Sequence, residues 1–303
     1  MFGSHLSIAG NMCNALSAAQ ELTLDTVQVF TKNQRQWKVK PLDDADADEW
    51  VRQLRALNWT DRTVSHNSYL VNLASPNDEL WEKSLNLQRD EIERCERLSI
   101  PFLVSHPGAH TGSGVDAGLK RIADAYTTLL KDTAGYNTVI CIENTVGGGS
   151  NLGGPFEDLA TIRNLLLERI PKEAEKRIAF CFDTCHALAF GHDVRTPDTV
   201  NETLASFESL CGAGTIKVAH FNDSKTPFAS HKDRHEHIGL GHLGAEGFRA
   251  LSNHPALRDI PKILETPKDD HDSGRPWDAV NLELLRSFLT TPAPKRRSSS
   301  TRA

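Results

Sequence analysis

Side chains able to bind a divalent metal ion recur at comparable places along this chain. The stretch 177–193, RIAFCFDTCHALAFGHD, contains a continuous apolar run that ends at Asp183, and His186 follows three residues later. An Asp and a His at this spacing in a first helical turn can point the same way, although a capping Asp with a structural His is the commoner explanation of one such stretch. The pattern is repeated, because five other apolar runs end in a His or a Glu: His66, His106, Glu143, His220 and Glu265.

A further pair lies in the segment SHKDRHEH. Residues i and i+2 of an extended segment project from the same side, so Asp233 and His235 can face one ion while Arg234 points away. We expect His231 and His237 to be bystanders. The whole set comprises five imidazoles and four carboxylates, namely His66, His106, Glu143, Asp183, His186, His220, Asp233, His235 and Glu265.

This set of donors predicts a cluster of metal ions. Imidazoles mixed with carboxylates suit zinc or another borderline divalent ion better than calcium or magnesium, which favour oxygen ligands. A catalytic zinc uses about three protein ligands, so nine ligands imply two or three ions. Clustered ions can generate hydroxide at neutral pH and stabilise both oxygens of a phosphodiester displacement, which favours hydrolysis of a P–O bond.

Strands alternating with helices must position these residues. Apolar runs predict strands over 2–7, 26–31, 62–66, 101–106, 138–143, 178–183, 216–220 and 262–265, and helical spacing predicts helices over 10–22, 43–57, 78–98 and 115–131 among others. Eight such units predict an α/β protein with a single closed (β/α)8 barrel over 1–291, in which the strand ends meet at one mouth. An open doubly wound sheet is the alternative, but its glycine-rich turn should follow the first strand, whereas Gly147, Gly148 and Gly149 follow the fifth.

Composition places the chain among ordinary globular proteins. Of its 303 residues 39% are apolar and 24% charged, and neither a secretory signal nor a stretch of membrane-spanning length is visible, so we expect a cytoplasmic protein without a membrane partner. The net charge of −6 argues against coating nucleic acid by bulk electrostatics, but it is compatible with a surplus of buried carboxylates. We expect the six cysteines to be reduced core thiols, and residues 292–303, PAPKRRSSSTRA, to form a disordered basic tail.

Nine short motifs occur in order after the predicted strands: GSHLSIAG, FTKNQRQW, SHNSYLVNLASP, HPGAH, IENTVGGGSNLG, FDTCHALAFGHD, HFNDSK, DRHEHIGLG and ILETP. Each motif is weak alone, but together they cover nearly the whole chain up to about Pro292. In this order they resemble the endonuclease IV family of apurinic/apyrimidinic endonucleases, which are DNA-repair enzymes with a trinuclear zinc site in a TIM barrel.

The resemblance implies three Zn²⁺ ions per chain, with Mn²⁺ able to occupy part of the sites. Carried onto matching positions, the zinc ligands form three sets: His66, His106 and Glu143; Glu143 again with Asp183, His220 and Glu265; and His186, Asp233 and His235. As the bridging carboxylate, Glu143 would be the catalytic residue that orients or deprotonates the nucleophile.

The resemblance also implies a substrate. The family cuts duplex DNA 5′ to an abasic site, leaves a 3′ hydroxyl and a 5′ deoxyribose phosphate, and trims blocked 3′ ends. Arg35, Tyr69 and Leu70 match positions that insert from the minor groove when the abasic nucleotide is flipped out, although ordinary packing would also explain Tyr69 and Leu70. Further groove or backbone contacts are implied for Lys32, Asn33 and Gln34. We expect a monomer.

Two other functions remain open at this point. A divalent-metal sugar isomerase or epimerase also places His, Asp and Glu at the strand ends of a barrel, but it would have no use for His186, Asp233, His235 or the Arg35 loop. About three zinc ions per chain would favour the nuclease, and one or two exchangeable manganese or magnesium ions the isomerase. A non-catalytic binder of damaged DNA is a third reading, which the complete set of ligand positions disfavours.

Overall fold

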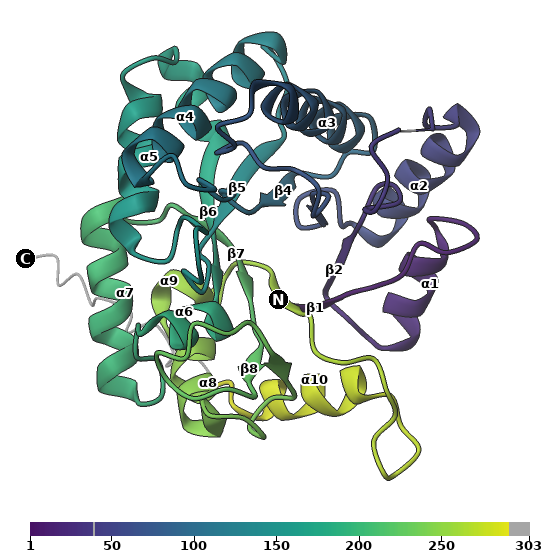
Figure 1. Cartoon of the computed structure of the whole chain (residues 1–303). Helices are drawn as coiled ribbons and strands as arrows, with labels where there is room; N and C mark the ends of the chain where they lie inside the picture. The colour runs from purple at the N-terminus through teal and green to yellow at the C-terminus, as the bar shows by residue number, and fades with distance from the viewer. Residues whose placement is uncertain (39, 291–303) are drawn as a thin grey trace, which may run out of the picture.

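Eight parallel strands close into a barrel in this computed structural model, which describes residues 1–38 and 40–290 (Figure 1). Neighbouring strands follow the order β1-β10-β7-β6-β5-β4-β3-β2, and β2 pairs with β1 to complete the circle. The barrel strands are β1 (Phe2–His5), β2 (Thr26–Val29), β3 (Val64–His66), β4 (Phe102–Ser105), β5 (Val139–Glu143), β6 (Ile178–Asp183), β7 (Ile216–His220) and β10 (Lys262–Leu264). The predicted closed barrel is confirmed, and the open sheet is wrong.

The helices form an outer layer around these strands (Figure 1). They are α1 (Asn14–Glu21), α2 (Asp44–Leu57), α3 (Asp78–Arg97), α4 (Val115–Asp132), α5 (Phe156–Leu167), the 3₁₀ helix η1 (Lys172–Arg177), α6 (Thr184–Phe190), α7 (Pro197–Cys211), α8 (Gly244–Asn253), α9 (Pro255–Arg258) and α10 (Trp277–Ser287). The first helix is shorter than the predicted 10–22, because the Asn11 side chain accepts a hydrogen bond from Cys13 N and holds a turn before it. A small antiparallel hairpin, β8 (Asp223–Ser224) with β9 (His235–Glu236), lies beyond β7.

A layer of small apolar side chains fills the inside of the barrel. Its buried members are Val64, Val104, Cys141, Ala179, Cys181, Val218 and Ile263. Side chains two residues apart on a strand share a face, so the residue two positions after a member of this layer also points inward, one level nearer the mouth. By this rule, His66 lies above Val64, Glu143 above Cys141 and His220 above Val218, all pointing into the barrel. The alternation of the strands thus directs the metal-type side chains into the mouth.

A second, larger apolar cluster lies between the strands and the helices and includes the fully buried Trp50, Phe180 and Phe182. All six cysteines are buried free thiols, which confirms their prediction as reduced core residues. Among the described residues, no helix is both long and apolar enough to cross a membrane. The tail predicted for 292–303 lies outside the described residues.

Candidate functional site

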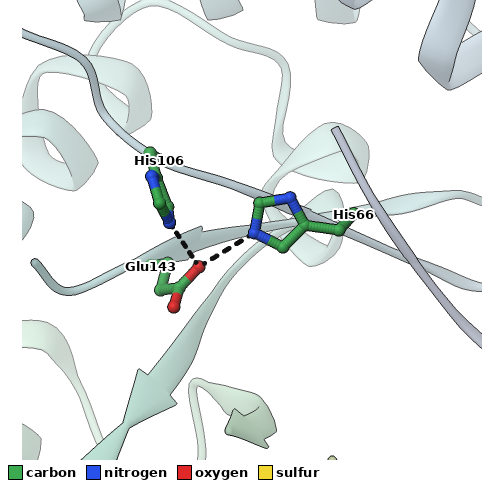
Figure 2. A group of neighbouring side chains, drawn as sticks. All are labelled: His66, His106 and Glu143. Carbon is green, nitrogen blue, oxygen red and sulfur yellow. Dashed lines mark hydrogen bonds and ion pairs between the residues drawn. The ribbon is translucent and has the colours of Figure 1, made fainter. Parts of the chain in front are cut away.

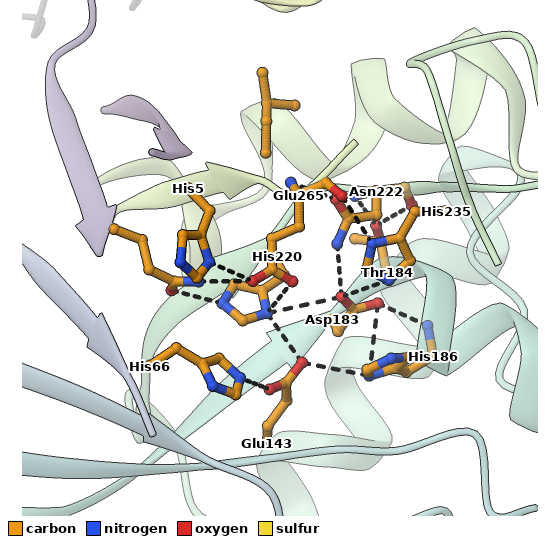
Figure 3. A network of polar contacts seen from close by, with 12 residues as sticks. His5, His66, Glu143, Asp183, Thr184, His186, His220, Asn222, His235 and Glu265 are labelled. Atoms are coloured by element: carbon orange, nitrogen blue, oxygen red, sulfur yellow. Dashed lines mark hydrogen bonds and ion pairs between the residues drawn. The ribbon is translucent and has the colours of Figure 1, made fainter. Parts of the chain in front are cut away.

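The nine side chains singled out by residue type lie together at the mouth of the barrel. Figure 3 shows His66, Glu143, Asp183, His186, His220, His235 and Glu265 of this set. The nine side chains form three groups, and within each group the potential ligand atoms lie within 4.8 Å of one another. We call these the His66 group (His66, His106, Glu143), the Glu265 group (Glu143, Asp183, His220, Glu265) and the Asp233 group (His186, Asp233, His235). Each group could hold a metal ion, and Glu143 belongs to two of them.

In the His66 group, two imidazoles converge on one carboxylate oxygen (Figure 2). His66 Nε2 lies 3.2 Å and His106 Nε2 3.1 Å from Glu143 Oε2. The three residues come from β3, from the position after β4 and from β5, which are neighbours in the barrel. His66 and Glu143 are buried and His106 is half-buried, so the group opens to solvent on the His106 side.

The Glu265 group lies deeper in the mouth. His220 Nδ1 lies 2.9 Å from Glu143 Oε1, 3.2 Å from Glu265 Oε2 and 3.8 Å from Asp183 Oδ2. His220, Glu143 and Asp183 are completely buried. Because Glu143 faces the His66 group with one oxygen and His220 with the other, its carboxylate can bridge two ions.

The Asp233 group is the most open of the three. The two oxygens of Asp233 face two imidazoles, with His186 Nε2 at 3.3 Å from Oδ2 and His235 Nε2 at 3.1 Å from Oδ1. Asp183 is also the N-cap of α6, because its Oδ1 accepts a hydrogen bond from His186 N at 2.7 Å. Asp183 therefore both caps the helix and lies among the candidate ligands, so the two explanations of this motif are compatible.

Backbone carbonyls orient three of the imidazoles. Nδ1 of His66 donates to Asn67 O at 2.9 Å, that of His186 to Asn144 O at 2.9 Å, and that of His235 to Glu265 O at 3.1 Å. A carbonyl can only accept, so each Nδ1 carries a proton and leaves Nε2 facing the carboxylates. This arrangement is usual for metal-binding histidines, whose second nitrogen donates to a neighbouring oxygen.

The cluster concentrates negative charge in a buried place. Burial alone would raise the pKa of Glu143, but the facing imidazoles of His220 and His106 hold it well below its usual range. Burial likewise works against protonation of His220, yet Glu265 and Glu143 raise its pKa to about 9. The pKa of His235 is also raised to about 9 against burial, by Asp233 and Asp183. A buried carboxylate stays ionised only beside a positive charge, and here protonated imidazoles or metal ions can provide that charge.

The hydrogen bonds of the cluster leave a nitrogen unsatisfied, which a metal ion could bind. His235 Nε2 is buried and has no hydrogen-bond partner among the described residues, although two carboxylates lie nearby. An imidazole nitrogen that faces two carboxylates without a hydrogen bond can give up its proton to bind a metal ion, and the mixed imidazole and carboxylate donors suit zinc. Cys181 and Cys185 also approach the cluster. Burial and Asp183 raise the pKa of Cys185 to about 12, so that side chain is a neutral thiol.

Four polar residues that the sequence did not single out support the cluster. Asn222 Nδ2 donates to Asp183 Oδ2 at 2.8 Å, and Asn144 exchanges hydrogen bonds with the backbone of Asp183. His5 and Gln28 contact Glu265 at 3.2 and 2.7 Å. His5 ends β1 and Gln28 lies on β2, but the predicted strands ran on to residues 7 and 31, so neither residue stood at a predicted strand end.

Lys32 makes a buried ion pair with α3. Its ammonium pairs with Glu91 of α3, and the two side chains are only 8% and 2% exposed. Thr31 Oγ1 donates to the other oxygen of Glu91 at 2.8 Å. Because its ammonium pairs with Glu91, Lys32 anchors the start of its loop in this structure, and its contact with DNA stays a prediction.

The other residues expected to contact DNA lie on two loops above the mouth. Ser68 Oγ donates to Gln34 O at 2.7 Å and joins the loop 31–37 to the loop 68–70. The Asn33 side chain accepts from Arg35 N at 2.9 Å and turns the first loop, which leaves Arg35 exposed.

Tyr69 is the most prominent group at this rim. It is 66% exposed, although its ring centroid lies 6.0 Å from that of His66 and 5.8 Å from that of Phe30. Leu70 is half-buried and packs against the main core. A recess of about 330 Å³ lies beside Tyr69, and its lining includes His106, His186 and Asp233. The loops, the recess and the cluster thus form one continuous site.

Two further histidines lie outside the cluster, as expected. His231 Nδ1 donates to Val146 O at 2.8 Å, and His237 stacks on Trp277 with ring centroids 3.8 Å apart. Within the part of the chain that the structure describes, neither belongs to a metal-type group.

Comparisons with known proteins agree with this geometry. A family profile described as Xylose isomerase-like TIM barrel matches residues 16–288. Probable endonuclease 4 of Chloroflexus aurantiacus is 44% identical over 288 residues, which cover 95% of this chain and 98% of that protein. Endonuclease IV from Thermus thermophilus, a solved structure, superimposes with a TM-score of 0.79 and 32% identity, over 95% of this chain and 98% of that chain.

A more distant structure shares only the architecture. A D-tagatose 3-epimerase-like protein superimposes with a TM-score of 0.69, but at 19% identity over 95% of this chain and 96% of that one, so this likeness concerns the fold alone. The full-length match to proteins named endonuclease 4 confirms the resemblance seen in the motifs. The chain therefore belongs to the endonuclease IV family within the xylose isomerase-like TIM barrels, and it is a nuclease.

Proposed function

We propose that this enzyme hydrolyses the phosphodiester 5′ to abasic sites in duplex DNA, leaving a 3′ hydroxyl and a 5′ deoxyribose phosphate, and that it trims blocked 3′ ends. The observation that carries the proposal is the meeting of three metal-type groups, two of them sharing Glu143, beside an exposed rim of Arg35 and Tyr69. A phosphodiester placed in the recess would lie against His106, His186 and Asp233.

We assign one zinc ion to each group. The His66 group would hold the first, the Glu265 group the second and the Asp233 group the third, with Glu143 shared by the first two. When bound, zinc supplies Lewis acidity for hydrolysis of a phosphodiester at neutral pH. The donor chemistry supports zinc, and manganese could replace it in part because imidazole and carboxylate also suit that ion.

The residues of the chain have separate tasks in this proposal. Glu143, buried between His66, His106 and His220, is placed to orient the attacking water through a carboxylate oxygen. The backbone carbonyls behind His66, His186 and His235 keep the imidazoles in one orientation, so no reorganisation is needed during the reaction.

The rim would recognise the lesion. Arg35 and Tyr69 are exposed on adjoining loops and can enter the gap that a missing base leaves in the duplex. Unstacking a nucleotide costs least where the base is already absent, which favours abasic sites over intact DNA. Leu70 supports Tyr69 from the core side and would contact the duplex at its edge.

The test uses a duplex that carries one tetrahydrofuran abasic analogue, which a β-eliminating lyase cannot cleave. The zinc-loaded enzyme should cut on the 5′ side and leave an end that a polymerase extends directly, and a strong chelator should stop the reaction. An intact duplex of the same sequence is the control. Failure of the loaded enzyme to cut the analogue would overturn the proposal.

Metal analysis separates this proposal from the sugar isomerase alternative. The nuclease should contain about three zinc ions per chain, whereas an isomerase would use one or two exchangeable ions and would leave the Asp233 group unused. Turnover of a ketose by the loaded protein, without cleavage of abasic DNA, would favour the isomerase.

A further inference from the structure

Gln28 is a buried amide at the centre of the mouth. It lies on β2 and is completely buried, yet its side chain contacts residues from the far side of the barrel. Its Oε1 lies 2.9 Å from His220 Nε2, at the end of β7, and its Nε2 lies 2.7 Å from Glu265 Oε1, next to β10. One amide therefore joins two members of the Glu265 group.

The chemistry of these contacts fixes their direction. A carboxylate can only accept, so the amide nitrogen of Gln28 must face Glu265, and the amide oxygen must face His220. The oxygen can only accept, so His220 Nε2 carries a proton. His220 is left to present Nδ1, which lies 2.9 Å from Glu143 Oε1 and 3.2 Å from Glu265 Oε2.

His220 differs in this respect from the other oriented imidazoles. His66, His186 and His235 donate from Nδ1 to backbone carbonyls and present Nε2, whereas His220 donates from Nε2 to a side chain and presents Nδ1. A backbone carbonyl is retained in every substitution of its residue. The orientation of His220, by contrast, depends on the identity of the residue at position 28.

His5 supports this amide from the intervening strand. Its Nδ1 lies 3.0 Å from Gln28 Nε2 and 3.2 Å from Glu265 Oε1, and β1 stands between β2 and β10 in the barrel. This one nitrogen of His5 either accepts from the amide or donates to the carboxylate, according to its tautomer, so the contact that holds in both cases is the one from Gln28 Nε2 to Glu265 Oε1. With Oε1 bound to Gln28, Oε2 is the oxygen of Glu265 that faces His220.

We propose that Gln28 is a positioning residue of the metal centre, whose amide selects the nitrogen of His220 and the oxygen of Glu265 that face the ion. The inference rests on the proposed function, since it concerns the ion assigned to the Glu265 group. Without the amide oxygen, the Nε2 proton of His220 would be buried without an acceptor, and the ring would be free to turn or to exchange its tautomer.

The experiment compares Gln28→Met, which keeps the volume but removes both hydrogen bonds, with Gln53→Met, which removes a half-buried amide on α2 that donates to Glu49. Zinc affinity is measured on the metal-free proteins by competition with a chromophoric chelator. Gln28→Met should bind one of its ions about 10- to 100-fold more weakly, as is usual when a hydrogen-bond partner of a ligand is lost. Gln53→Met should match the wild type.

A second readout reports orientation directly. Long-range ¹H–¹⁵N correlation spectra of the zinc-loaded protein should show His220 protonated at Nε2 in the wild type and in Gln53→Met, and this signature should be lost in Gln28→Met. A role in packing alone would leave it unchanged, because methionine fills the same space. If Gln28→Met does not fold, Gln28→Asn, whose shorter side chain cannot span both contacts, should weaken zinc binding in the same direction.

The outcomes distinguish this inference from the function on which it rests. A wild-type chain that binds no zinc would overturn both. A wild type that binds three zinc ions and cuts abasic DNA, together with a Gln28→Met variant of equal zinc affinity and unchanged His220 signals, would overturn the role of Gln28 alone.

Discussion

The mouth of the barrel and the two loops above it differ in burial. At the mouth, each candidate ligand stands at a strand end or is tied by hydrogen bonds to one, and Glu143, Asp183 and His220 are fully buried. On the loops, Arg35 and Tyr69 are exposed. The candidate ligands are therefore enclosed by neighbouring groups, whereas the rim residues face solvent.

The loops are nevertheless tied down at a few points. The Lys32–Glu91 pair holds the beginning of the first loop against α3, and the Ser68–Gln34 hydrogen bond joins the two loops. Enclosed groups suited to chemistry and exposed groups suited to recognition thus stand close together, because the loops are anchored at these points. The following substitutions test this division.

The largest effect is expected at the mouth. Glu143→Gln removes the carboxylate shared by the His66 and Glu265 groups, so cleavage of abasic DNA should fall on the order of 10³-fold or more, which is about 4 kcal/mol in the barrier. The measurement is single-turnover cleavage at saturating enzyme. Glu82→Gln, an exposed site on α3, should cut normally, and near-normal cleavage by Glu143→Gln would refute its role.

The anchor of the loop should matter for stability. Lys32→Met leaves Glu91 buried without its cation, so the free energy of unfolding in urea should drop by about 3–5 kcal/mol. The exposed pair of Lys83 and Glu79 is the matched control, and Lys83→Met should change stability by less than about 1 kcal/mol.

The same Lys32→Met protein also tests whether Lys32 contacts DNA. Its affinity for an abasic duplex should keep the salt dependence of the wild type, because the Lys32 ammonium of the wild type pairs with Glu91. If the slope of log affinity against log salt decreases in magnitude by about one, Lys32 contacts DNA and the anchor assignment is wrong.

A smaller effect is expected at the open side of the cluster. Asp233→Asn removes the charge between His186 and His235, so affinity for one zinc ion should fall about 10- to 100-fold and the content after dialysis should drop from three ions to two. Elemental analysis measures the content, with Asp198→Asn on the exposed first turn of α7 as the control. Retention of three ions would remove Asp233 from the ligand set.

The smallest effect is expected at the rim. Arg35→Ala should weaken binding to an abasic duplex by about tenfold, and should reduce the salt slope by about one, while single-turnover cleavage of the bound complex changes less. Fluorescence anisotropy over a salt series gives both numbers. Arg55→Ala, exposed on α2, should bind as the wild type does, and an unchanged affinity of Arg35→Ala would count against the loop assignment.

The sequence indicated the barrel and the meeting of six of the nine side chains because both follow from the strand ends, whereas His186, Asp233 and His235 were found from local spacing. An apolar strand that ends in His, Asp or Glu marks its own mouth end, and Cys141 before Glu143 or Val218 before His220 repeats the pattern. The same rule failed for His5 and Gln28. Strands were predicted over 2–7 and 26–31, which placed both residues inside a strand, whereas β1 ends at His5 and β2 at Val29.

The direction of Lys32 could not be predicted for a different reason. Its partner Glu91 lies on α3, far along the chain, and the two meet only because the barrel brings the loop against that helix. A basic residue in a polar loop normally faces water, and the residues next to Lys32 in the sequence give no sign of a buried carboxylate partner. Such a partner is determined by tertiary packing, which cannot be read from the spacing of neighbouring residues.

Asp183 links a helix start to the candidate ligands. One of its oxygens starts α6 by accepting from His186 N, and the other accepts from Asn222. A substitution of Asp183 would therefore disturb the first turn of α6 and the ligand set together. Asp233, with 49% of its side chain exposed, borders the solvent more than the other candidate ligands do, so the ligand set is open to water on that side.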